Sequence, residues 1–193
     1  MLHRKTFKNL CLVFATCMLL AACASRPEIQ PRSAAVPADV DFSGVWQIRL
    51  DPDAKPIPRE GDDGRIQIPS VNPQRRDGKR PSKRSSDSAV QIFLETGELL
   101  KISQTADGLF ISFDRAIVEE YTFGENRIVS VGPIEAQRVS GWQGRDFVVE
   151  TLDAQGGLLT EIWHLDADVL VRDISVSRGD KQQFSSQQQF EGT

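Results

Sequence analysis

The last hundred residues of the chain carry a regular β pattern, and this pattern limits the possible folds more than any other feature. Short segments in which apolar and polar residues alternate are separated by turn sequences such as Asp107-Gly108, Gly132-Pro133 and Arg178-Gly179-Asp180. Such turns join neighbouring antiparallel strands into hairpins. We therefore predict strands near 98–105, 108–115, 117–123, 127–131, 134–142, 145–152, 157–165, 168–177 and 181–190.

An earlier strand is predicted between Phe42 and Leu50, because Trp46, Ile48 and Leu50 fall on one face of an extended chain. Residues 87–95 fit a short helix or a strand, and we slightly favour the helix. A meander of this many strands removes its exposed edges by closing. The expected fold is mainly β, an antiparallel meander that closes into a β-barrel, with a β-sandwich as the alternative.

The stretch 51–87 breaks the pattern. It contains six of the ten prolines and no aromatic residue, so we predict a disordered insertion within a single β domain spanning 42–193. The sequence also allows a short paired strand at Ile66-Gln67-Ile68. The insertion ends in a basic run that contains Arg75, Arg76, Lys79, Arg80, Lys83 and Arg84.

This basic run contrasts with the rest of the domain, because residues 88–193 carry 8 basic and 17 acidic side chains. Mobile cations near a bilayer attract anionic head groups, so an anionic lipid or lipopolysaccharide is one expected partner. The alternative is a solvated loop that docks on the domain's own acidic face. An exported chain is not expected to meet nucleic acid.

The first 22 residues have the order of a secretory signal peptide. Arg4, Lys5 and Lys8 precede an apolar run of about 13 residues, which is shorter than the roughly 20 that a transmembrane helix needs. The run ends in Leu20-Ala21-Ala22-Cys23. This sequence resembles the lipobox of bacterial lipoprotein precursors, and the resemblance implies cleavage before Cys23, acylation of Cys23 and retention at the cell outer membrane, with the domain facing the periplasm.

Residues 23–41 follow the cleavage site and are predicted to form the lipidated cysteine and a flexible tether. They are rich in Ser, Ala, Pro and charge, with no aromatic residue, and cannot bury enough apolar area to fold alone. Cys11 and Cys17 would leave with the signal peptide, so no intrachain disulfide is expected.

Three aromatic motifs carry a second resemblance, over about 42–190. They are Asp41-Phe42-Ser43-Gly44-Val45-Trp46, Trp142-Gln143-Gly144-Arg145 and Glu161-Ile162-Trp163. Together they resemble small exported bacterial β domains of uncharacterised, lipocalin-like type. The resemblance implies a lipocalin-like barrel.

The candidate site residues are few. Trp46, Trp142 and Trp163 are candidates for lining a ligand cavity, although core packing is the more common role of such side chains. His164 is the single histidine left after cleavage, and Glu119, Glu120, Asp166 and Asp168 are the closest carboxylate pairs. We expect no catalytic residue, metal or cofactor among them.

The expected function is non-enzymatic. The β domain would bind a small hydrophobic or amphipathic ligand or an envelope protein partner. The alternatives are an envelope hydrolase that uses carboxylates at the barrel mouth, and a scaffold that binds other proteins through its sheet edges.

Overall fold

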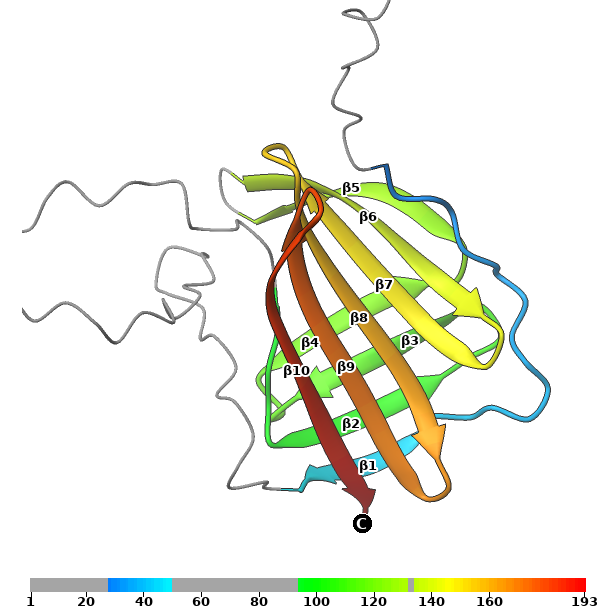
Figure 1. Ribbon diagram of the computed structural model, residues 1–193. Coiled ribbons are helices and arrows are strands. Elements are labelled where there is room, and N and C mark those ends of the chain that lie inside the picture. Colours follow the sequence, from blue (N-terminus) through cyan, green and yellow to red (C-terminus); the bar gives the residue numbers. More distant parts are fainter. Residues whose placement is uncertain (1–27, 50–93, 132–133) are drawn as a thin grey trace, which may run out of the picture.

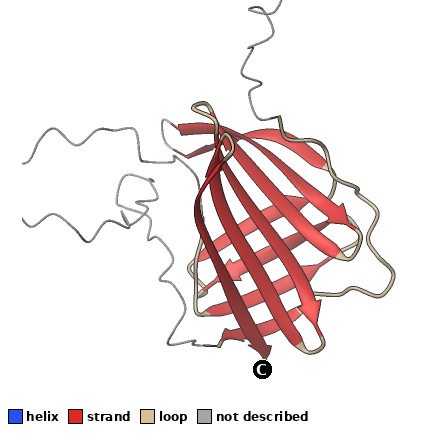
Figure 2. Ribbon diagram, in the orientation of Figure 1, coloured by secondary structure: helices blue, strands red, loops and turns tan. Residues whose placement is uncertain are grey.

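A computed structural model describes residues 28–49, 94–131 and 134–193. These residues form ten strands and contain no helix (Figures 1 and 2). The strands are β1 (Gly44–Ile48), β2 (Leu99–Gln104), β3 (Gly108–Phe113), β4 (Ile117–Thr122), β5 (Glu125–Val131), β6 (Ile134–Gln143), β7 (Asp146–Asp153), β8 (Gly157–Asp166), β9 (Val169–Arg178) and β10 (Lys181–Gly192). All ten predicted strands are present.

The strands make one sheet, in the order β4-β3-β2-β1-β10-β9-β8-β7-β6-β5, and every neighbouring pair is antiparallel. The first strand pairs with the last, so the meander curls round on itself. In Figure 1, β5 to β10 form one wall and β1 to β4 lie behind it, crossing the strands of the first wall at a steep angle. The predicted barrel is confirmed.

Alternation along the strands decides which side chains enter the barrel. Leu109, Ile111 and Phe113 of β3 are buried, while Phe110 between them is 39% exposed. Their register partners Tyr121 and Glu119 on β4 also face inward, while Ile117, the partner of Phe113 at the start of β4, is 43% exposed. The main core cluster consists of Val40, Phe42, Trp46, Leu100, Ile102, Leu109, Ile111, Phe113, Tyr121, Phe123, Trp142, Phe147, Val149, Trp163, Leu170 and Phe190.

The barrel has a seam between its two edge strands. Strands β4 and β5 follow one another in the chain but share no ladder of backbone hydrogen bonds. Side chains bridge the seam instead: Arg138 and Arg127 each donate to the Glu120 carbonyl at 3.2 Å, and the Ser140 hydroxyl donates to the Thr122 carbonyl at 2.9 Å. Donors from β5 and β6 thus satisfy carbonyls that the sheet leaves unpaired.

Residues 28–41 run along the outside of the barrel and are called the strap below. Ser33 exchanges two backbone hydrogen bonds with Trp142, and Arg32 reaches Glu150 of β7 at 2.7 Å. Ile29 and Val40 are only 4% and 5% exposed. The prediction of a free tether is therefore wrong for residues 28–41.

The physical reason is that the strap does not need a core of its own. It packs apolar side chains such as Ile29 and Val40 against the barrel, and glycine on β6 gives it room. A Cβ on Gly141 would lie 2.6 Å from the Ser33 carbonyl oxygen and 2.8 Å from the Arg32 Cβ. Composition measures whether a segment can fold alone, and it does not reveal docking on another surface.

Several predictions lie outside the described residues. These are the signal peptide, Cys23, the insertion 51–87 with its basic run, and most of the helix expected at 87–95. Leu94 and Glu95, which are described, are not helical. Among the described residues, no helix is long and apolar enough to cross a membrane.

Candidate ligand site in the barrel interior

The end of the barrel under the strap is filled with aromatic rings. Trp142 lies 5.5 Å from Phe42, 5.3 Å from Phe123 and 5.6 Å from Phe147, measured between ring centroids. Gln104 fixes the strap across this end, because its amide donates to the Val40 carbonyl and its oxygen accepts from the Phe42 amide. This end is a packed core.

Deeper along the barrel, an ion pair is buried inside the apolar walls. Arg172 of β9 donates to the Glu161 carboxylate of β8 through Nε, at 2.9 Å, and through Nη2. The other terminal nitrogen of Arg172 donates to the Gln188 side chain at 3.1 Å and to the Glu95 carbonyl at 2.9 Å. The two charged side chains are 1% and 3% exposed.

Aromatic faces complete the surroundings of Arg172. Its guanidinium carbon lies 4.6 Å from the centroid of Trp163 and 5.4 Å from that of Phe113. Both distances fall within the range of a cation–π interaction, which strengthens when the cation is removed from water. Arg172 is therefore held by a carboxylate, by hydrogen-bond acceptors and by ring faces at the same time.

A second set of charged side chains lies near the seam. Arg138 of β6 is 3.0 Å from a Glu119 oxygen and 3.4 Å from a Glu125 oxygen, and its guanidinium lies 4.9 Å from the Tyr121 ring centroid. Arg127 also pairs with Glu125, at 3.0 Å, from a more exposed position. The Glu119 and Glu125 carboxylates near the seam and the Glu161 carboxylate of the interior ion pair thus each face a guanidinium group.

Tyr121 lies between the two sets. Burial raises the pKa of its phenol well above the ordinary value, and the nearby carboxylates of Glu161 and Glu119 raise it further. Arg138 and Arg172 act in the opposite direction but do not cancel these effects. Glu119, Tyr121, Glu125, Arg138, Glu161 and Arg172 together are called the polar band below.

The three predicted tryptophans all face inward and are buried, and they differ in their indole N–H groups. The N–H of Trp46 donates to the Phe42 carbonyl at 2.9 Å. The buried N–H groups of Trp142 and Trp163 have no hydrogen-bond acceptor in the described part of the chain. A buried donor without an acceptor is costly, so the indole N–H groups of Trp142 and Trp163 can each donate one hydrogen bond to a guest molecule.

The polar band was not predicted from the sequence. Arg172, Glu161 and Arg138 alternate with apolar residues in the same way as charges on an outer face do. The available signal was the alternation of side chains between the two faces of a strand: Arg172 shares its face of β9 with Leu170 and Ile174, both of which are buried. A charged residue at an inward position of a strand marks a buried polar group that requires a partner.

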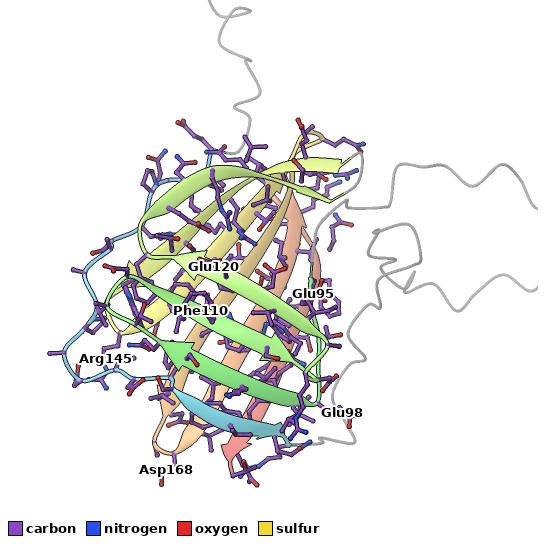
Figure 3. All side chains as sticks on the ribbon, turned by 180° about the vertical axis from the view of Figure 1, so that it is seen from behind. Glu95, Glu98, Phe110, Glu120, Arg145 and Asp168 are labelled. Carbon is purple, nitrogen blue, oxygen red and sulfur yellow. The ribbon has the colours of Figure 1, made fainter. Side chains whose placement is uncertain are left out.

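The remaining candidates are distributed over both faces of the sheet and a turn. Glu120 faces outward beside Phe110 and Glu119 faces inward, while Asp168 lies at the β8–β9 turn (Figure 3). His164 is half-buried on the outer face, with its Nδ1 atom 3.8 Å from Asp173. Within the described ranges, no group of three or more His, Cys, Asp and Glu side chains is placed to hold a metal ion.

The three glutamates of the polar band are engaged by arginines. Glu119, Glu125 and Glu161 each face an arginine, so none of them is presented free to a sugar or an ester. A hydrolase that uses two carboxylates needs one to donate a proton and one to attack or activate water. The arrangement therefore gives the hydrolase alternative no support.

Comparison with known proteins adds little. No protein-family model and no curated protein matches the sequence. Two solved structures from Ramazzottius varieornatus are similar: a secretory abundant heat soluble protein, with 12% identity, and secretory abundant heat soluble protein 4, with 13%. Each covers 49% of this chain, and 70% and 68% of its own, at a TM-score of 0.39. A likeness at this level carries no argument about function.

Substitution of Glu161 by Gln tests whether Arg172 depends on Glu161 as its counter-ion. It leaves the Arg172 charge buried without its counter-ion, so we expect the free energy of unfolding to fall by about 3–5 kcal/mol. The matched control is Glu191→Gln, which breaks the exposed pair with Arg49 and should cost less than about 1 kcal/mol. Urea denaturation measures both, and equal small losses would show that Arg172 reaches water.

Tyr121 is the only tyrosine of the chain, so tyrosinate absorbance reports on this residue alone. The native phenol should remain protonated well above pH 10, while the unfolded chain ionises near about pH 10. Because the folded state then holds the extra proton, stability is complete below about pH 10 and falls above it, by at most about 1.4 kcal/mol per pH unit. Tyr121→Phe should remove this dependence, and ordinary ionisation in the native protein would contradict it.

Proposed function

We propose that this chain is a bacterial outer-membrane lipoprotein, anchored through Cys23, whose barrel binds a neutral amphipathic molecule without catalysing a reaction. The lipobox Leu20-Ala21-Ala22-Cys23 supports the anchor. Several acyl chains on one residue would hold the domain stably, whereas a single chain would be marginal. The domain would face the periplasm.

The observation that carries the ligand proposal is the pair of unpartnered indole N–H groups beside the polar band. Trp163 lies against Arg172, and Trp142 lies in the aromatic cluster next to Phe147, which is the register partner of both tryptophans. These donors require acceptors, and apolar rings surround them. A guest with hydrogen-bonding oxygens and an apolar tail has this combination of properties.

The charges of the polar band, together with that of the neighbouring Arg127, favour a neutral guest. Arg127, Arg138 and Arg172 face three glutamates, so none of these three positive charges is left over for a ligand carboxylate. An ester carbonyl or a hydroxyl accepts a hydrogen bond without bringing a charge into a buried site. We therefore assign the ligand to the class of monoacylglycerols and similar neutral lipids.

A scaffold that binds an envelope protein is the second candidate. The packed aromatic end under the strap favours it, since a filled interior leaves less room for a guest. The partner would add to the edges of the sheet at the seam, where Val118 of β4 and Ile128 of β5 are each 63% exposed. Saturable binding of a small molecule inside the barrel separates the two.

The basic run Arg75, Arg76, Lys79, Arg80, Lys83 and Arg84 lies outside the described residues. We propose that it attracts an anionic lipid or lipopolysaccharide next to the anchor, which is a role separate from that of the interior. Its attraction would weaken with salt, unlike the binding of a neutral guest in the interior.

Trp163→Phe tests the interior site. It keeps an aromatic ring, although a smaller one, and removes the indole N–H, so binding of a monoacylglycerol should weaken by about tenfold, the equivalent of one hydrogen bond. Displacement of the neutral dye Nile red measures the dissociation constant.

The matched control is Trp46→Phe, whose N–H already donates to Phe42. It should lower stability but leave ligand affinity unchanged. Equal affinities for all three proteins, or tighter binding of the free fatty acid than of its glycerol ester, would refute the assignment.

Cys23→Ser tests the anchor. Without the thiol there is no acylation site, and the protein should move from the membrane fraction to the soluble fraction. Mass spectrometry of the purified chain should show acyl groups on the wild type and none on the variant. Membrane retention of the variant would contradict the anchor.

A further inference from the structure

The strap limits how far the barrel can move from its anchor. Residues 28–41 are fixed to the barrel by the Arg32–Glu150 pair, by the Ser33–Trp142 hydrogen bonds and by the burial of Ile29 and Val40. Between Cys23 and Glu28 there are five Cα–Cα steps, which span at most about 18 Å when fully extended. A free chain from Cys23 to Phe42 would span at most about 65 Å when fully extended.

The difference between these lengths decides whether the barrel can turn over. Strand β8 has 10 residues and is therefore about 33 Å long. A connecting chain of about 65 Å between Cys23 and the barrel would let either end of the barrel touch the bilayer, whereas a connecting chain of about 18 Å is shorter than the barrel itself. The end of the barrel near Glu28 is then kept at the membrane.

The figures show which end this is. The strap begins at the upper end of the molecule, beside the labelled strand β5 (Figure 1). The β8–β9 turn, with Asp168, and the C-terminus lie at the lower end (Figures 1 and 3). In the wall formed by β1 to β4, β4 is the strand closest to β5, so the seam belongs to the upper part.

The two most exposed large hydrophobic side chains lie on the strands that border the seam. They are Val118 of β4 and Ile128 of β5, each 63% exposed. Contact with the apolar and head-group boundary of a bilayer would remove these side chains from water.

We propose that the strap holds the barrel in one orientation on the lipid bilayer, with β5 and the seam toward the membrane and the β8–β9 turn away from it. This inference rests on the anchor at Cys23 proposed above. The seam then faces the phase in which a neutral lipid is dissolved, so a ligand need not cross water to reach the barrel.

Single labelled cysteines test the orientation. The processed chain has no cysteine besides the acylated Cys23, so Ile128→Cys and Asp168→Cys each provide one free thiol. The full-length lipidated protein is reconstituted in phosphatidylethanolamine and phosphatidylglycerol vesicles, and quenching of a thiol-linked fluorophore by nitroxide-labelled lipids is measured. The label at 128 should be quenched severalfold more than the label at 168.

A longer chain between Cys23 and the strap provides the decisive variant. Insertion of a Gly/Ser linker of about twelve residues between Ser25 and Arg26 leaves every described residue unchanged but gives the barrel room to turn over. The contrast between the two labels should then fall toward equality. The same linker appended after Thr193 is the control and should leave the contrast intact.

Each outcome has a defined consequence. Equal quenching of both labels in a protein that carries its acyl groups would overturn the orientation and leave the anchor standing. A contrast that survives the linker inserted after Ser25 would show that the strap does not set the orientation. A chain without acyl groups would overturn both the anchor and the orientation.

Discussion

The buried contact between Arg172 and Glu161 is the interaction on which the interior of this barrel depends. Each charge alone would be strongly destabilising away from water, and the pair is tolerated because Gln188, the Glu95 carbonyl and two aromatic faces satisfy the remaining guanidinium surface. This requirement fixes the relative positions of β8, β9 and β10 and of the chain that enters β2. It also explains how an apolar barrel can contain a polar layer.

Closure of the barrel is the second constraint. Pairing of β1 with β10 joins the first and last strands of the chain within the sheet, and side chains from β5 and β6 replace the missing ladder between the edge strands β4 and β5. The strap covers one end and presses Phe42 into the aromatic cluster. The barrel is thus tightly packed under the strap and polar in its middle layer. Along the seam, side chains join the edge strands in place of a ladder of backbone hydrogen bonds.

The sequence was most informative where local periodicity and turn chemistry decide the structure. The strands from Leu99 onward are set by alternation and by turns such as Gly144 and Gly179, both of which adopt positive φ. The polar band was missed because a charged residue on a strand looks the same whether it faces water or a buried partner. The strap was missed because its stability comes from contacts more than a hundred residues away, such as Arg32 with Glu150.

The three tryptophans differ in the hydrogen bonding of their indole N–H groups, and this difference can be measured directly. In a ¹H–¹⁵N correlation spectrum of the labelled protein, each of the three indole N–H groups gives one signal. On titration with a monoacylglycerol, the signals of Trp142 and Trp163 should move, while that of Trp46, already bonded to Phe42, should stay in place. Three unmoved signals, or movement confined to Trp46, would contradict a ligand site inside the barrel.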